Sequence, residues 1–216
     1  MDTLLKIVQI GFYITAASIG ILTYLKAKNG LLNTVNTEYQ KKVIDRLAEL
    51  STELLDEFDS SSDNYWLRED SVKEILDRIH EEIIPYKSEI ISGARSLHGI
   101  PVSKKEEKLQ AFLSKVMSDP FIPSDIRSKI LNLVEGRLNA MRSAHYTEIE
   151  KYQEGLKSGI YWDTLDGNDG WLHNKISRRL YKSGYGISDV ESQVHKIRTD
   201  IQLYFEGFNP IKKYNK

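Results

Sequence analysis

Four basic residues near the C-terminus have the types and the spacing that would bind an anion: Lys175, Arg178, Arg179 and Lys182. On a helix, spacings of three, four and seven residues bring side chains to one face, so these residues form one basic stripe. Arginine binds phosphate or carboxylate oxygens through paired hydrogen bonds, which suits a nucleotide, an anionic lipid headgroup or an acidic partner. An exposed face that only aids solubility is the more frequent use of such a stripe. We therefore treat the four residues as a candidate anion-binding site.

The remaining polar residues give no catalytic or metal-binding pattern. His145 and Glu148 are three residues apart, and we interpret them as solvated or capping residues. The acidic segment 163–169 lacks the alternating ligands and terminal glutamate of a calcium-binding loop, and it predicts a turn. The histidines do not have the paired spacing of a helical zinc site: His80, His98, His145, His173 and His195. We predict no catalytic residue, no metal and no cofactor, with an active site assembled from distant residues as the open alternative.

Composition excludes several classes of function. The 30 basic and 31 acidic residues give a net charge of −1, so we expect no specific nucleic-acid binding, which normally requires a basic domain. The chain has no cysteine, which excludes disulfides, a cysteine nucleophile and thiolate zinc sites, and this is consistent with a reducing compartment. With 40% hydrophobic and 28% charged residues, the composition is typical of a folded protein.

The uncharged segment of nineteen residues from Ile7 to Leu25 predicts a single transmembrane helix. As a helix it would span roughly 28 Å, close to the hydrocarbon thickness of about 30 Å. A buried core helix is the main alternative. A cleaved signal peptide fits less well, because the segment ends in Tyr24-Leu25-Lys26 rather than in small residues.

The lysines around this segment predict its orientation. Lys26 and Lys28 follow the span directly, whereas only Lys6 precedes it. The positive-inside rule therefore puts the C-terminal region in the cytoplasm, with the span in the inner (cytoplasmic) membrane. We expect residues 1–28 to form the membrane anchor and residues 29–216 to form the cytoplasmic domain.

Small and polar residues share one face of the predicted span: Gln9, Ala16, Gly20 and Thr23. Small residues four apart let helices approach closely in lipid, and side-chain amides or hydroxyls form hydrogen bonds across such a contact. An unpaired amide in hydrocarbon is costly, so Gln9 favours self-association. The alternative is that a single span tolerates these residues without any partner.

Apolar residues that recur every three or four positions predict an all-α cytoplasmic bundle of roughly six helices, with no strands. We expect a break or a kink at Asn29-Gly30 and helix caps at Ser103, Ser124 and Ser188. The expected helices cover about residues 37–58, 67–84, 103–116, 124–152, 171–180 and 188–205, with a short segment after Pro85.

The chain resembles the small membrane effectors of bacterial antiphage defence systems in its arrangement. In those effectors, a short anchor precedes a cytoplasmic sensing or assembly domain. The resemblance concerns the architecture of the whole chain, rests on no motif and transfers no functional residue. It implies a homo-oligomeric effector that opens a pore or disrupts the bilayer under the control of its cytoplasmic domain. The expected partners are the lipid bilayer, further copies of the chain, and a cytoplasmic regulatory protein or an anionic ligand. The alternatives are a membrane-tethered adaptor without channel or enzymatic activity, and a tethered enzyme with an unfamiliar all-α site.

Overall fold

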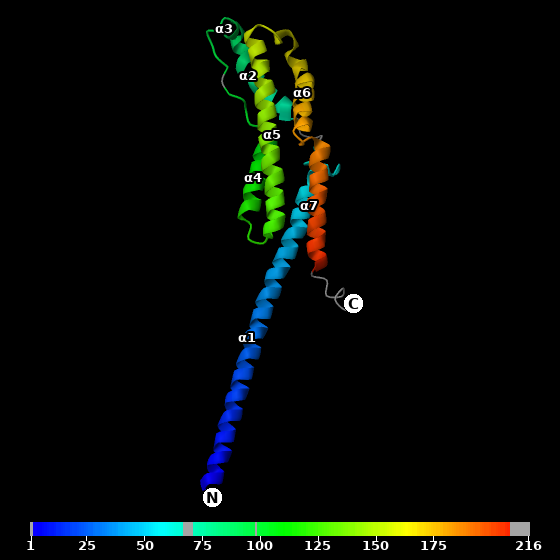
Figure 1. Cartoon of the computed structure of the whole chain (residues 1–216). Helices are drawn as coiled ribbons and strands as arrows, with labels where there is room; N and C mark the ends of the chain where they lie inside the picture. Colours follow the sequence, from blue (N-terminus) through cyan, green and yellow to red (C-terminus); the bar gives the residue numbers. More distant parts are fainter. Residues whose placement is uncertain (1, 67–70, 98, 208–216) are drawn as a thin grey trace. The chain divides into compact units, whose positions relative to one another are not determined.

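Every regular element in the described part of the chain is helical. The computed structural model describes residues 2–66, 71–97 and 99–207, and no strand occurs within these ranges (Figure 1). This confirms the predicted all-α class. The chain divides into two compact units, Met1–Arg46 and Leu47–Lys216.

Helix α1 (Asp2–Leu55) forms the first unit as far as Arg46. Its last turns, from Leu47 onward, belong to the second unit. We expected a break or a kink at Asn29-Gly30, and the break is wrong, because the helix continues through both residues. A single glycine costs a helix only about 1 kcal/mol relative to alanine, and the Thr34 hydroxyl donates to the Gly30 carbonyl at 3.0 Å. Helix formation is cooperative, so flanking turns carry such a weak position when no proline interrupts them. Among the described residues this is the one helix long and apolar enough to cross a membrane.

The second unit is a bundle of helices joined by short connections. After α1 come the 3-10 turn Asp56–Phe58, α2 (Ser71–Ile83), the 3-10 turn Ile84–Tyr86, α3 (Lys87–Ile91), α4 (Lys104–Ser118), α5 (Ser124–Lys157), the 3-10 segment Trp162–Gly167, α6 (Asn168–Lys182) and α7 (Ile187–Gly207). The helix predicted over residues 37–58 is the continuation of α1 with the 3-10 turn after it, and the other predicted helices are present as separate elements. The expected start of the second predicted helix at Leu67 lies outside the described residues.

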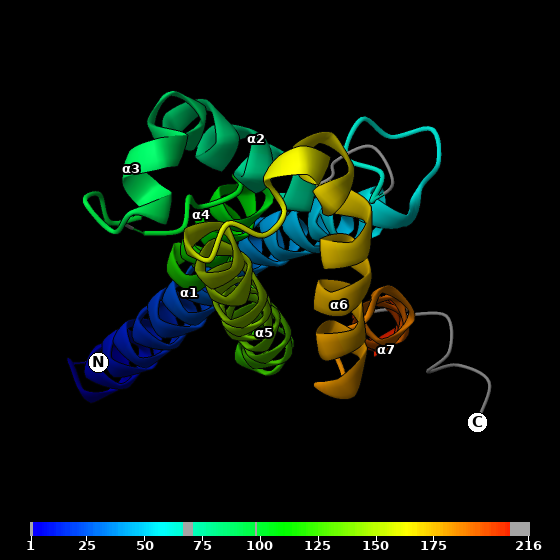
Figure 2. The same cartoon turned by 90° about the horizontal axis from the view of Figure 1, so that it is seen from above.

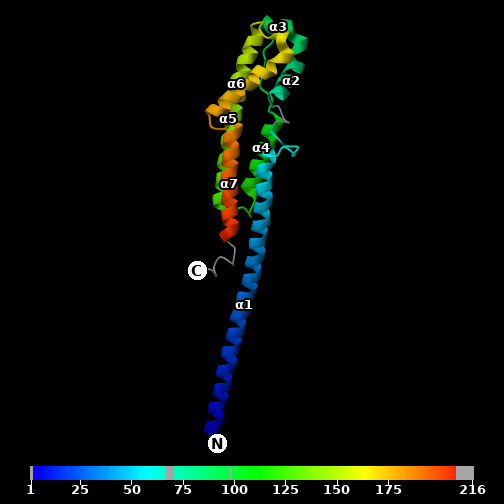
Figure 3. The same ribbon diagram turned by 90° about the vertical axis from the view of Figure 1, so that its right-hand side faces the viewer.

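Helix α5 is the central element of this unit. Helices α4 and α7 lie beside its N-terminal part, and α6 returns along its C-terminal part (Figures 1 and 3). Helices α2 and α3 cover the same C-terminal part on another side, as the view in Figure 2 shows. One core cluster lies where α2, α3, α6 and the C-terminal part of α5 meet, and its buried members are Val72, Ile75, Leu76, Ile79, Ile83, Ile90, Ala144, Ile149, Tyr152, Leu156, Trp162, Leu172 and Ile176. Burying each large apolar side chain contributes about 1.5–3 kcal/mol, so this cluster holds these elements together.

Two of the three expected helix caps differ from the structure. Ser103 caps α4 as predicted, and its hydroxyl accepts the Glu106 N–H at 3.3 Å. The caps predicted at Ser124 and Ser188 are wrong. Ser124 is the first residue of α5 and Ser188 lies inside α7, where Asp189 accepts the Gly186 N–H at 3.1 Å instead. Serine and aspartate both satisfy free N–H groups at a helix start, so the sequence alone leaves the choice between neighbours open.

Candidate functional site

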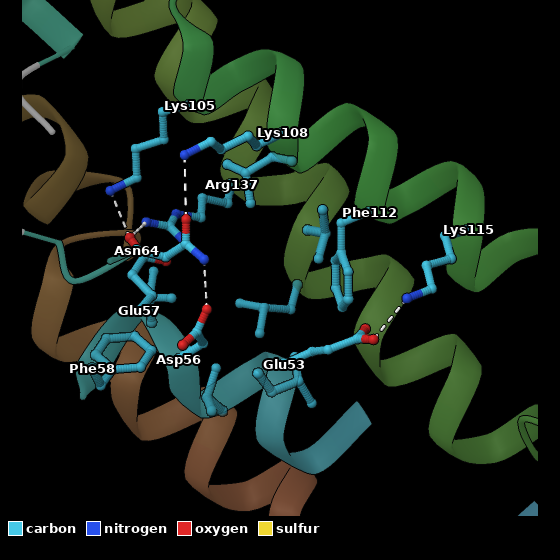
Figure 4. A pocket seen from close by; sticks show the side chains of 16 residues that line it. Glu53, Asp56, Glu57, Phe58, Asn64, Lys105, Lys108, Phe112, Lys115 and Arg137 are labelled. Atoms are coloured by element: carbon cyan, nitrogen blue, oxygen red, sulfur yellow. Dashed lines mark hydrogen bonds and ion pairs between the residues drawn. The ribbon is translucent and has the colours of Figure 1, made fainter. Parts of the chain in front are cut away.

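A cavity of the second unit lies between the end of α1, α4, α5 and α7 (Figure 4). Its volume of about 470 Å³ falls in the range of small-molecule pockets. We call it the Glu57 pocket, after the carboxylate on its rim. Its walls are apolar: Leu54, Phe58, Leu109, Phe112, Leu133, Val134, Val190 and Val194. The sequence analysis did not identify this pocket, because its walls come from four separate helices.

A buried ion-pair cluster closes one side of the Glu57 pocket. Arg137 donates two hydrogen bonds to the Glu57 carboxylate, at 2.5 and 2.6 Å, and Lys105 Nζ lies 2.5 Å from Glu57 Oε1. Burial by itself raises the pKa of Glu57, but the bonds and charges of Arg137 and Lys105 outweigh it and lower the pKa to about 2. Glu57 is therefore a permanent counter-ion near neutral pH and does not serve as a general acid or base there.

The rest of the rim is also tied by hydrogen bonds. Asn64 donates to Asp56 at 2.6 Å and accepts from Lys108 Nζ at 3.2 Å, while Lys115 Nζ lies 2.7 Å from Glu53 Oε1 (Figure 4). Bonds from Ser62 and Asn64 lower the pKa of Asp56. The pocket is thus lined by apolar walls and by charged or polar groups that are already paired with one another.

The predicted basic stripe forms a second site. Lys175, Arg178, Arg179 and Lys182 lie together at a depression of about 320 Å³ on the surface of α5 and α6. Two residues of α5, Glu148 and Lys151, complete the depression. We call these six residues the basic depression. The structure therefore brings together all four residues that the sequence singled out, and it adds a fifth cation and one carboxylate.

Glu148 is the centre of the basic depression. Its side chain is only 7% exposed, and its carboxylate pairs with Arg179 and lies 3.9 Å from Lys151 Nζ. Lys175 Nζ lies 4.6 Å from the centre of the Trp171 ring, a cation–π distance. The sequence interpretation of Glu148 as a solvated residue is wrong, because the helix face that it shares with buried residues faces α6.

His145, its predicted companion, is buried too. His145 Nδ1 lies 2.8 Å from Glu106 Oε1, and both side chains are 5% exposed. This pair joins α4 to α5 in the interior, so the solvated interpretation fails here as well. His98 lies outside the described residues, and no three His, Asp or Glu side chains form a metal-binding group within the described ranges.

A buried polar network surrounds Asn168, which the sequence analysis assigned to a loop. Asn168 donates to the Tyr152 hydroxyl at 3.1 Å and to the Tyr161 carbonyl at 3.2 Å, and it accepts from Thr164 and from Trp171 Nε1 at 3.0 and 3.1 Å. All four hydrogen-bonding positions of the amide are thus used. The network anchors the first turn of α6, which explains why the helix begins earlier than predicted.

The four residues of the predicted membrane stripe are exposed along α1. With about 100° per residue, Gln9, Ala16, Gly20 and Thr23 fall within one face about 60° wide. Tyr13 lies on the same face, and the Gln9 amide donates to its hydroxyl at 3.4 Å. The hydroxyls of Thr15 and Ser18 donate to carbonyls one turn earlier, at 2.9 and 2.8 Å, so the helix satisfies these polar groups by itself.

Comparisons with protein families, curated proteins and solved structures find no match to this chain. Its function therefore has to be argued from the exposed apolar helix, the Glu57 pocket and the basic depression.

Proposed function

We propose that this chain is a single-pass protein of the inner (cytoplasmic) membrane, in which residues 7–25 span the bilayer and residues 29–216 form a cytoplasmic helical domain. The observation that supports this is the exposure of the apolar segment of α1. Its large apolar side chains are 47–69% exposed: Ile7, Val8, Ile10, Phe12, Tyr13, Ile14, Ile19, Ile21, Leu22, Tyr24 and Leu25. Soluble proteins rarely expose so large a continuous apolar surface, so lipid or another chain must cover it.

The energetics favour lipid. The nine aliphatic and phenylalanine side chains of the span each contribute about −0.3 to −0.6 kcal/mol on an insertion scale, or about −4 kcal/mol together. No charged residue opposes insertion between Lys6 and Lys26. Polar hydroxyls that bond within the helix lower the remaining cost of the span.

Membrane insertion and orientation are testable by a pelleting and labelling experiment. Full-length protein should pellet with membranes after alkaline extraction and should partition into liposomes. Because the natural chain has no cysteine, a single Ser158→Cys variant can report orientation. In intact spheroplasts, a membrane-impermeant maleimide should leave this exposed residue unlabelled until the membrane is lysed. Protein that stays in the supernatant, or that is labelled before lysis, would refute the anchor or its orientation respectively.

We further propose that the spans associate through the face of Gln9, Ala16, Gly20 and Thr23, making the protein a homo-oligomeric effector that opens or disrupts the bilayer. Small residues on one face allow close approach, and the Gln9 amide supplies a hydrogen bond that gains value in lipid. The same arrangement of anchor and cytoplasmic domain underlies the resemblance to bacterial antiphage effectors.

Membrane depolarisation on expression tests the effector proposal. Gln9→Leu and Gly20→Leu should abolish depolarisation and reduce crosslinked oligomers, because they remove the amide and the close approach. Ile14→Leu, on the opposite face of the helix, is the matched control and should behave as the unaltered protein does. Depolarisation that is absent in the unaltered protein, or equal in all variants, would refute this function.

A membrane-tethered binding module is the second candidate, and the Glu57 pocket and the basic depression favour it because both are concave sites within the second unit. An exchange of residues 7–25 for polyleucine separates the two functions. A tethered module should keep its activity after the exchange, whereas an effector that acts through its span should lose it.

A further inference from the structure

We propose that the basic depression binds a small phosphate-bearing anion and that Glu148 is a built-in competitor for it. The six residues of this site belong to the second unit, so the proposal does not depend on the membrane anchor. The shared ligand chemistry is a group with two or more phosphate charges, supplied either by a soluble polyphosphate or by the headgroup of an anionic lipid.

The charge of the site supports an anionic ligand. Five cations and one carboxylate line the depression and leave a net charge of about four, in a chain whose total charge is −1. Arg178 and Lys182 have no hydrogen bond or ion pair with any residue in the described part of the chain. Two unpaired cations beside three further ones repel each other, and a multivalent anion relieves that repulsion.

The shape of the site favours phosphate over a larger acidic surface. The depression has a volume of about 320 Å³, which suits one or two phosphate groups. Adjacent arginines offer planar, paired donors to phosphate oxygens, while the lysines supply mobile point charges around them.

Glu148 determines how the site responds to such a ligand. Its carboxylate is almost fully buried and holds Arg179, whose side chain remains 42% exposed. A phosphate that arrives from solvent reaches the exposed side of the same guanidinium, so it competes with Glu148 for that cation. The protein carboxylate thus draws on the same cation as the ligand and weakens binding without closing the site.

Three variants separate these roles. Lys175→Gln/Arg178→Gln/Lys182→Gln removes three cations but keeps Arg179 paired with Glu148, which protects the fold. Glu148→Gln removes the competing charge with almost no change of shape. The matched control changes two exposed lysines elsewhere, Lys104→Gln and Lys196→Gln.

The experiment uses the full-length protein in nanodiscs of zwitterionic lipid, with tripolyphosphate as the soluble probe. Calorimetry gives the affinity, and acetylation footprinting reports protection of Lys175 and Lys182. The triple variant should bind at least about tenfold more weakly, because each lost bond to a charged group accounts for roughly one factor of ten. Glu148→Gln should bind severalfold more tightly, and the control should bind unchanged.

The source of the phosphate is decided by two arms. Protection by added tripolyphosphate in zwitterionic nanodiscs supports a soluble ligand. Protection that instead requires nanodiscs containing a phosphoinositide supports a lipid headgroup. Absence of protection in both arms, or equal binding by the triple variant and the control, overturns the site, and weaker binding by Glu148→Gln overturns the role of the carboxylate.

Discussion

The Glu57–Arg137–Lys105 cluster makes a quantitative prediction about the dependence of stability on pH. The pKa of Glu57 is lowered from 4.5 to about 2 in the folded protein. A difference of one pKa unit corresponds to about 1.4 kcal/mol, so the ionised carboxylate contributes on the order of 3 kcal/mol to the free energy of unfolding. Because the folded-state pKa is the lower one, this contribution is complete above pH 4.5. It is lost as the pH falls from 4.5 to about 2.

Glu57→Gln tests this contribution, because glutamine keeps the shape and removes the charge. Near pH 7 the variant should be about 3 kcal/mol less stable than the unaltered protein, since the mostly buried Arg137 loses its main counter-ion. Below pH 4.5 the difference between the two proteins should shrink, and it should vanish below about pH 2, because protonated glutamate and glutamine are then both neutral.

Urea unfolding in a non-ionic detergent measures the difference. The three tryptophans, Trp66, Trp162 and Trp171, all lie in the second unit, so their fluorescence reports the unfolding of that unit. Glu135→Gln, an exposed position on α5, is the control and should change stability by less than about 0.5 kcal/mol at every pH. A Glu57→Gln effect that stays constant between pH 5 and pH 2 would show that the loss comes from packing and not from the carboxylate charge.

Two further substitutions should destabilise the second unit in the same assay. A Cβ on Gly136 would lie 1.8 Å from the Tyr185 hydroxyl, so Gly136→Ala should lower the free energy of unfolding by about 1–3 kcal/mol. The control is Gly170→Ala, whose Cβ would meet no atom within 4 Å, and it should be neutral or stabilising by up to about 1 kcal/mol. Asn168→Ala should lower the free energy of unfolding by about 2–3 kcal/mol, because its buried hydrogen-bonding partners lose their bonds. The control is Asn174→Ala at an exposed position, which should lower it by less than about 0.5 kcal/mol. Equal effects of the two glycine variants, or of the two asparagine variants, would contradict these predictions.

Apolar periodicity was enough to predict the helical class and most of the helices, because each helix of the second unit buries one face. The same periodicity also indicates a buried face of α5 that was not predicted. Met141, His145, Glu148 and Tyr152 follow one another at spacings of four, three and four, the pattern of a single buried face. The polarity of His145 and Glu148 suggested solvent exposure, yet partners on neighbouring helices satisfy both polar groups.

Local sequence patterns predicted the helix ends less well than the helices, and they did not predict the Glu57 pocket. Asn29-Gly30 has turn-forming composition but lies between good helix formers, so cooperativity overrides it. The Glu57 pocket depends on Arg137 of α5 meeting a carboxylate 80 positions earlier in the chain, and no spacing rule relates such residues. The basic stripe was predictable because all four of its residues belong to one helix, α6.

The two ends of helix α6 are held by different interactions, so we expect the C-terminal end to unfold locally before the N-terminal end. Buried hydrogen bonds of Asn168 hold its first turn, whereas the ion pair that helps to hold its last turn joins Glu148 to Arg179, whose side chain is 42% exposed. Backbone amide protons near Lys182 should therefore exchange with solvent sooner than those near Leu172. An anion that breaks the ion pair between Arg179 and Glu148 would unfold the final turn of α6 but not its first turn. The change in structure would therefore be limited to a few residues.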